Sequence, residues 1–231
     1  MQQAQKPNDV YRLLANTPFT DYITTNYDHS FELTLKEEGY VEGKGNMSEK
    51  TYSIRRHRTF HKGSISKRIW HIHGDLERPR SFMLGYDHYC GGLAKINEYV
   101  KGNYKSSEGL SHKINKIEER FKEGQHFQDI KSWIDLFFLY DVHFIGYGLD
   151  LSEIDIWWLL NRRIRMFKEQ KMHITNSIFF HSTGKKKKDK ETVERYHLLN
   201  AFKIRNIKQH PKQNDYASAY TEILNRIVDR K

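Results

Sequence analysis

Cysteine is nearly absent from this chain of 231 residues, in which Cys90 stands alone. A single cysteine excludes an internal disulfide bond and every zinc module that is built on cysteine pairs. Because disulfides are rare in reducing compartments, their exclusion here favours a cytoplasmic location as the default.

Long apolar runs are also lacking. The run 156–160 is among the longest, whereas a helix that crosses a bilayer needs roughly 18 apolar residues or more. Residues 1–7 contain no apolar stretch of the kind that opens a signal peptide. We therefore expect a cytoplasmic protein without a membrane partner.

Acidic residues are outnumbered, with 29 Asp and Glu against 39 Lys and Arg, so the formal net charge is +10. Positive surfaces attract nucleic acids and other polyanions. A solvated loop is the alternative interpretation for any one basic cluster. The main cluster has seven cations and no acid: Lys50, Arg55, Arg56, Arg58, Lys62, Lys67 and Arg68. The polyanion contact is expected over Lys50–Arg68.

Hydrophobic residues make up 37% of the chain and aromatic residues 13%, which predicts a lean core built largely from rings. The length fits one α/β domain or one core domain with an insertion. Runs rich in β-branched and aromatic residues alternate with helical patterns, which is typical of a parallel sheet. The expected strands are 19–25, 68–73, 81–84, 141–146, 177–180 and 203–207.

Helix signals lie between these strands. We expect one helix over 9–15, one through Phe31 and Leu35 capped by Asp28, and one with an apolar stripe over 110–121. A capping box at 152–155 predicts the start of another helix. Asn214 or Asp215 is placed to cap a last helix, on which Tyr216, Tyr220, Ile223, Leu224 and Ile227 share a face.

Together these elements predict an α/β fold: a Rossmann-like, mostly parallel sheet with helices on both faces and a helical insertion. We expect 1–231 to form a single domain, with a basic insertion over 39–67 and the helical insertion over 86–140. The strands at 19–25 and 141–146 are expected in the same sheet.

Polar groups follow three of the predicted strands, in the segments 24–28, 71–75 and 144–150. Ligands of open α/β sheets bind beyond the carboxyl ends of the strands. Each segment also has a simpler interpretation. Asn26 and Asp28 can form a turn and a helix cap, one of His71 and His73 can be a hydrogen-bonded packing residue, and glycine turns such as 146–148 are common.

In this order, Thr-Thr-Asn-Tyr-Asp at 24–28, His-Gly-Asp at 73–75 and Phe-Ile-Gly-Tyr-Gly at 144–148 resemble the motifs of the bacterial sirtuin-like (silent-information-regulator-like) family. The resemblance covers roughly residue 19 to the C-terminus. It implies that Asn26 lies at the nicotinamide ribose, that His73 is a general base, and that Asp28 supports the asparagine loop.

The resemblance also implies a binding site for NAD, with Thr25, Gly74, Gly146, Tyr147 and Gly148 as its lining. The family divides into protein deacylases and NAD-hydrolysing defence effectors. The zinc cysteines of the deacylases are absent here, so the chain resembles the second group. NAD would then be a substrate, and we expect no metal.

One feature of the family has no counterpart in this sequence. Sirtuin-like enzymes carry a strand and a glycine-rich phosphate loop upstream of the asparagine motif, whereas the first glycine here is Gly39. Three explanations stay open: the chain begins inside the family domain, another polypeptide supplies the missing part, or NAD binding has been lost. The sheet would then have one position that is exposed or filled by another chain.

Two functions follow from this pattern. The first is an NAD+ glycohydrolase that releases nicotinamide, as an antiphage effector that forms a homo-oligomer or a complex with a sensor protein. The alternative is a catalytically degenerate sirtuin-like module that binds a partner protein or nucleic acid. Asn26, Asp28 and His73 favour the enzyme, and the missing phosphate loop favours the module.

Overall fold

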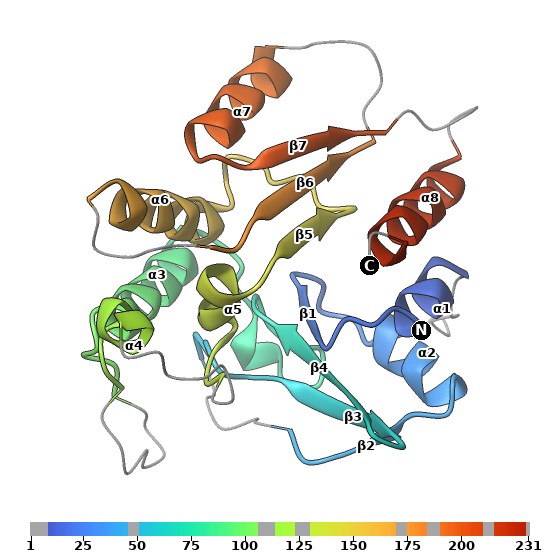
Figure 1. The fold of residues 1–231 in the computed structure, drawn as a ribbon. Coiled ribbons are helices and arrows are strands. Elements are labelled where there is room, and N and C mark those ends of the chain that lie inside the picture. Colours follow the sequence, from blue (N-terminus) through green and yellow to red (C-terminus); the bar gives the residue numbers. More distant parts are fainter. Residues whose placement is uncertain are drawn as a thin grey trace. The chain divides into compact units, whose positions relative to one another are not determined.

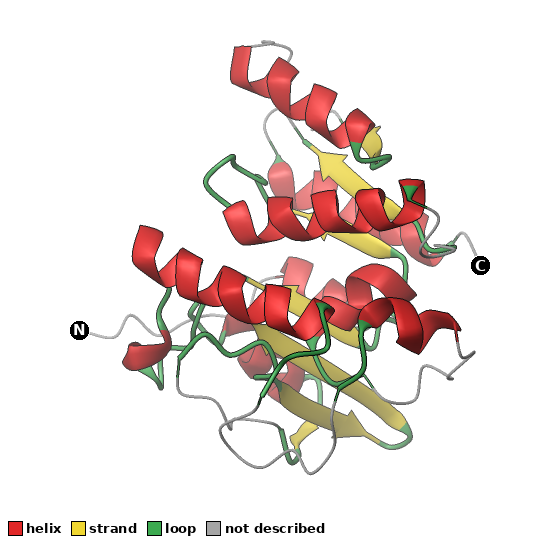
Figure 2. Ribbon diagram, turned by 90° about the vertical axis from the view of Figure 1, so that its left-hand side faces the viewer, coloured by secondary structure: helices red, strands yellow, loops and turns green. Residues whose placement is uncertain are grey.

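The computed structural model describes residues 9–45, 51–105, 114–122, 130–169, 175–183, 190–209 and 215–229. The chain divides into two compact units, one formed by 1–82 with 209–231 and the other by 83–208. Each unit has its own sheet (Figure 1). Helices accompany the strands in both units (Figure 2).

The first unit holds a four-stranded sheet in the order β1-β4-β3-β2. β1 and β4 are parallel, and the other two neighbouring pairs are antiparallel. Helix α1 packs against both α2 and α8 (Figure 1). The elements are α1 (Asp9–Ala15), β1 (Asp21–Thr24), α2 (Ser30–Glu37), β2 (Val41–Glu42), β3 (Arg58–Lys62), β4 (Ile65–His71), the 3-10 turn η1 (Pro79–Ser81) and α8 (Tyr216–Val228).

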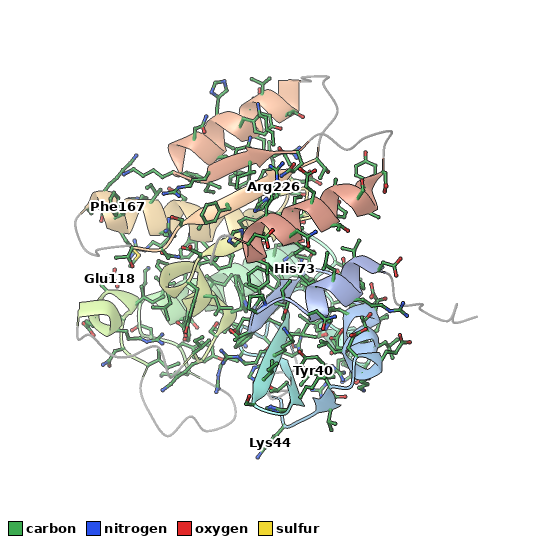
Figure 3. The ribbon with its side chains drawn as sticks, turned by 45° about the vertical axis from the view of Figure 1, so that its right-hand side comes forward. Tyr40, Lys44, His73, Glu118, Phe167 and Arg226 are labelled. Atoms are coloured by element: carbon green, nitrogen blue, oxygen red, sulfur yellow. The ribbon has the colours of Figure 1, made fainter. Side chains whose placement is uncertain are left out.

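Aromatic rings form much of the core of the first unit. The Tyr22 and Phe31 rings lie 4.8 Å apart between centroids, and Tyr40, labelled in Figure 3, is buried in the same cluster. Ring pairs at this separation contribute beyond their buried area. The ring-rich core expected from the composition is therefore present, with the buried members Ala15, Tyr22, Phe31, Leu35, Tyr40, Phe60 and Ile69.

The second unit holds a fully parallel three-stranded sheet in the order β5-β6-β7. The successive residues Ile178, Phe179 and Phe180 of the central strand are all buried, because helices cover a parallel sheet on both faces. Helices α3 and α5 pack on α6, and α7 packs on β7. The elements are α3 (Tyr86–Val100), α4 (Ile117–Lys122), α5 (Trp133–Leu139), β5 (Val142–Ile145), α6 (Ile154–Lys168), β6 (Ile178–Ser182), α7 (Lys190–Ala201) and β7 (Arg205–Lys208).

One mixed sheet and one fully parallel sheet, both accompanied by helices, make this a mixed α/β structure that is consistent with a Rossmann-like fold, so the predicted fold class is confirmed. The prediction of one shared sheet for 19–25 and 141–146 is wrong. Among the described residues, β1 has β4 as its ladder partner and β5 has β6. The alternation of strands and helices identifies the strands but does not specify which backbones exchange hydrogen bonds.

Two local predictions are also corrected. The segment 81–84 forms no strand, because η1 and extended backbone without a ladder partner take its place. The capping box at 152–155 is absent: α6 begins at Ile154, and its N-cap Glu153 makes no side-chain cap bond. The range 39–67 contains β2, β3 and the start of β4, and its interpretation as a basic insertion stays a prediction.

The remaining helix predictions are largely confirmed. α1 covers 9–15, and the Asp215 side chain caps α8 by accepting from the Ser218 N–H at 3.1 Å. Tyr216 is exposed rather than on the buried face of α8. Within the range 110–121, where one helix is expected, α4 begins at Ile117. Residues 106–113 lie outside the described residues, as do Lys50, Asn214 and 184–189. None of the described helices is long and apolar enough to cross a membrane.

Lys67 is a buried cation in the first unit, with 1% of its surface exposed. Its ammonium donates to the Thr17 carbonyl at 2.8 Å, to the Phe19 carbonyl at 3.0 Å and to the Tyr22 hydroxyl at 2.8 Å. All three of its protons therefore have acceptors. Burial nevertheless lowers the pKa of Lys67 to about 8, because the charged form loses its hydration.

This lowered pKa predicts that the protein becomes more stable as the pH rises above 8. Between the folded pKa and the unfolded value of 10.5, the unfolded chain binds more protons, so the free energy of unfolding increases with pH. We expect a gain of about 1 to 2 kcal/mol from pH 7.5 to 9.5 relative to Lys67→Met. Urea unfolding of both proteins at the two pH values measures it.

Tyr22 and Tyr40 face Lys67, and their pKa values are raised by burial, so they oppose the trend mainly above about pH 10. Parallel pH curves for the natural chain and Lys67→Met between 7.5 and 9.5 would contradict the prediction.

Candidate functional site

The asparagine and histidine motifs form two loops that lie side by side in the first unit. The Ile72 N–H donates to the Thr24 carbonyl at 3.1 Å, and the Leu76 N–H donates to the Tyr27 carbonyl at 3.0 Å. These backbone bonds bridge more than 40 residues of sequence. They continue the parallel pairing of β1 and β4 past the ends of both strands.

Asn26 is exposed at the first of these loops, and its own backbone N–H donates to the Thr24 hydroxyl at 3.0 Å. A hydrogen bond with the Asn26 side chain opposes the rise that burial and Asp28 cause in the pKa of Tyr11. The neighbouring Thr25 is half-buried. The amide of Asn26 thus stands at the surface of a loop whose backbone is held in place.

Asp28 acts at the start of α2, as the sequence predicts. Its carboxylate accepts the Ser30 N–H at 2.9 Å, while His29 occupies the N-cap position without a side-chain cap bond. An acceptor at the N-terminus of a helix satisfies one of the otherwise unpaired N–H groups. Asp28 therefore connects the asparagine loop to α2.

His73, labelled in Figure 3, follows β4 by two residues and is 3% exposed. The strand ends at His71, so the alternation that would place both histidines on one face does not reach His73. His71 is a buried, hydrogen-bonded residue. Its Nδ1 lies 3.0 Å from the Asn26 carbonyl oxygen, and its Nε2 lies 2.5 Å from Oε1 of Glu32.

Gly74 makes the turn after His73 with φ +131°, in the region that side chains rarely adopt. A Cβ at this position would lie 2.9 Å from the Phe82 Cα and 2.9 Å from the Ser81 carbonyl oxygen. The Phe82 ring in turn packs on Tyr27 at 4.5 Å between centroids. Gly74 thus allows the 79–82 segment to close against both motif loops.

Asp75 is fully buried and anchors the histidine loop. It accepts from His29 Nε2 at 3.0 Å and from the Glu77 N–H at 2.9 Å, and Arg58 lies 3.5 Å away. Burial alone raises the pKa of Asp75, but these donors outweigh it and hold the pKa well below its usual range. The same bond from His29 to Asp75 raises the pKa of His29.

Arg58 ties this carboxylate to the sheet. Its guanidinium also contacts Glu77 at 2.5 Å and Glu42 at 2.9 Å, so three carboxylates surround one cation. Arg58 therefore joins β3 to β2 and to the histidine loop through ion pairs.

The glycine motif belongs to the second unit, directly after β5. Gly146 has φ +66°, the Tyr147 ring stacks on Phe144 at 5.7 Å, and the Gly148 carbonyl accepts from Arg195 of α7 at 2.7 Å. Burial raises the pKa of the Tyr147 hydroxyl, with Glu153 adding to the rise. The expectation that 146–148 line one site together with Asn26 and His73 stays a prediction.

Residues 20–207 match the SIR2-like domain family. The chain belongs to this family. A segment of 91 residues is also 30% identical to the NAD(+) hydrolase ThsA of Bacillus cereus (strain MSX-D12), over 39% of this chain and 18% of that protein. The chain thus spans less than a fifth of the length of this relative. The resemblance inferred from the three motifs is confirmed at the level of the family.

The first unit also contains a group of three side chains of the types that bind metal ions. His29, Glu32 and His71 each offer one ligand atom, and these three atoms lie within 4.8 Å of one another. Two of the three are hydrogen-bonded to each other, and His29 is bonded to Asp75. The prediction of a site without metal stays a prediction.

Sequence reasoning missed the roles of His29, Glu32 and Arg58, although all three support the motif loops of the SIR2-like site. Charged groups are seldom buried unless they are paired, and the pairs here join distant parts of the chain. Only two features of the sequence point to these supporting residues. Glu32 follows Asp28 by one helical turn, and Asp75 completes the His-Gly-Asp motif.

The turn at Gly74 generates a stability prediction. Gly74→Ala combines a strained φ with two backbone contacts at 2.9 Å, so we expect a loss of about 3 kcal/mol. Gly85→Ala is the matched control, because Gly85 has a similar φ of +140° and nothing within 4 Å of the added Cβ. Its expected loss is about 1 kcal/mol. Equal losses in chemical denaturation would show that the close approach of 81–82 has no energetic weight.

Proposed function

We propose that this SIR2-like chain is an NAD+ glycohydrolase, with Asn26 and His73 as the catalytic pair and Asp28 as the support of the asparagine loop. The observation that carries the proposal is the backbone pairing of the two motif loops, from Ile72 to Thr24 and from Leu76 to Tyr27. The printed name of the similar Bacillus protein, NAD(+) hydrolase, supports the same chemistry.

The proposed reaction breaks the bond between ribose C1′ and the nicotinamide nitrogen. Nicotinamide leaves with the electron pair of that bond, and positive charge develops on the ribose. A neutral amide such as that of Asn26 stabilises this charge and orients water without an ionic charge of its own. Water attacks C1′ and gives its proton to the imidazole of His73, which acts as the general base. The products are ADP-ribose, nicotinamide and a proton.

The residues expected to line the site bind rather than react. Thr25 and Gly74 belong to the paired loops, next to Asn26 and His73. Gly146, Tyr147 and Gly148 precede α6, where close backbone approach suits a ribose or phosphate. In this proposal NAD is the substrate, and no step requires a metal.

Removal of either catalytic side chain tests the proposal. We expect Asn26→Ala and His73→Ala each to lower the rate of nicotinamide release from NAD+ by about 100-fold or more, because each removes a group needed in the transition state. Liquid chromatography of the nicotinamide formed measures the rate. The assay includes the products of neighbouring genes, in case a partner completes the site.

Asn161→Ala and His197→Ala are the matched controls, since both side chains are exposed on helices α6 and α7. Both should retain full activity. If Asn26→Ala cleaves NAD+ as fast as the natural chain, the catalytic assignment is wrong. If the natural chain binds a partner or nucleic acid but releases no nicotinamide in any combination, the degenerate module is the correct function.

We further propose that the enzyme is a cytoplasmic antiphage effector that acts as an oligomer or with a sensor partner. The support is the resemblance to the NAD-hydrolysing branch of the family, which lacks zinc cysteines as this chain does. The expected result is a fall in cellular NAD+ after phage infection when Asn26 is intact, measured in cells that carry the chain and its genomic neighbours. Unchanged NAD+ and unchanged phage yield would contradict the defence role.

For the proposed polyanion contact over Lys50–Arg68, fewer cations are available than the sequence alone implies. Arg58 and Arg68 pair with carboxylates, and Lys67 bonds to carbonyl oxygens within the fold. A cation already paired adds little to the salt-dependent attraction of a polyanion. Arg55, which is half-buried, is the first of the remaining cations to test.

A further inference from the structure

A buried histidine–glutamate pair lies beside the asparagine loop. His71, the last residue of β4, is 1% exposed, and Glu32 in the first turn of α2 is 3% exposed. Their atoms Nε2 and Oε1 are 2.5 Å apart. Neither residue belongs to the motif positions assigned to catalysis, yet His71 contacts one of them directly.

The other nitrogen of His71 holds the backbone of Asn26. Nδ1 lies 3.0 Å from the Asn26 carbonyl oxygen, and a carbonyl can only accept. Nδ1 must therefore carry a proton. The short bond on the opposite side of the ring needs one further proton between Nε2 and Glu32, whichever atom carries it. Glu32 thus selects the ring orientation in which His71 donates to Asn26.

Both peptide groups that flank the Cα of Asn26 are consequently fixed. The N–H on one side donates to the Thr24 hydroxyl at 3.0 Å, and the carbonyl on the other side accepts from His71. When both flanking peptides are held, the direction of the Cα–Cβ bond is set. The backbone bonds thus set the direction in which the Asn26 side chain leaves the loop, and its exposed amide hydrogen-bonds with Tyr11.

We propose that Glu32 and His71 are positioning residues, which act through the Asn26 backbone to hold its side chain in the orientation that NAD+ cleavage requires. The proposal rests on the function proposed above for Asn26. Loss of this positioning should lower kcat more than it raises KM, because a misdirected amide weakens stabilisation of the ribose charge in the transition state more than binding of the whole nucleotide.

A purely structural role is the competing explanation, since a buried pair with one partner removed is destabilising. Two double variants separate the explanations. Glu32→Met with His71→Leu replaces the pair by apolar side chains of similar volume, which buried pairs often tolerate. Glu32→Met with His71→Asn has almost the same shape but keeps an N–H donor near the position of Nδ1. The Asn variant buries additional polar atoms, so it should be no more stable than the Leu variant.

If the pair positions Asn26, the Asn variant should be the more active of the two double variants without being the more stable one. We expect the Leu variant to lose at least about tenfold in kcat, with KM for NAD+ within about threefold of the natural value. The Asn variant should recover most of the kcat despite a lower or equal Tm. A kcat that follows Tm across the two variants, or that is the same in both, would overturn the proposal.

Hydrogen exchange provides a readout that needs no catalysis. In the Leu variant, peptides covering 24–28 should exchange about tenfold faster than in the Asn variant, because the Asn26 carbonyl has lost its donor. Equal exchange in these peptides overturns the positioning role. If the natural chain releases no nicotinamide under any condition, the proposed function fails, while the exchange comparison still decides whether the pair holds the loop.

A measurement on the unaltered chain covers the case in which the variants do not fold. In protein with 15N-labelled histidine and 13C-labelled asparagine, NMR should detect a protected Nδ1–H on His71 that is coupled to the Asn26 carbonyl carbon. An unprotonated Nδ1 in the folded protein would contradict the proposal directly.

Discussion

Two backbone hydrogen bonds hold the candidate site together, from Ile72 to Thr24 and from Leu76 to Tyr27. They extend the parallel pairing of β1 and β4 beyond both strands, so that the asparagine and histidine loops share one position at the edge of the sheet. The buried groups nearby depend on this closeness. The bonds from His71 to the Asn26 carbonyl and from His29 to Asp75 form only when the two loops lie together.

Several charged side chains of this protein make contacts inside the fold rather than only at its surface. Lys67 is buried against carbonyl oxygens, and Arg58 joins β3 to the carboxylates of the histidine loop. The net charge of +10 therefore does not translate directly into a surface for polyanions. Part of the basic stretch stabilises the loops, because a buried carboxylate such as Asp75 stays ionised only with donors around it.

Local patterns in the sequence predicted local structure well. The helix over 9–15, the cap at Asp215 and the cores of the strands β1, β4, β5, β6 and β7 were recognisable, because each depends on neighbouring residues alone. β3 was missed since its five residues include three that are basic or histidine, which resembles a loop. The assignment of β1 and β5 to different sheets was missed because ladder partners are chosen by tertiary contacts.

For the site, the motif residues themselves could be predicted, but their supports could not. Glu32 and Arg58 resemble solvated surface residues in the sequence, and only the fold pairs them with His71 and Asp75. In the function proposed for this chain, the joined loops hold Asn26 against the nicotinamide ribose. A crystal structure of the His73→Ala variant with NAD+ tests it most directly. We predict the Asn26 amide within hydrogen-bonding distance of that ribose, and NAD+ bound away from the loop at 24–28 would contradict the account.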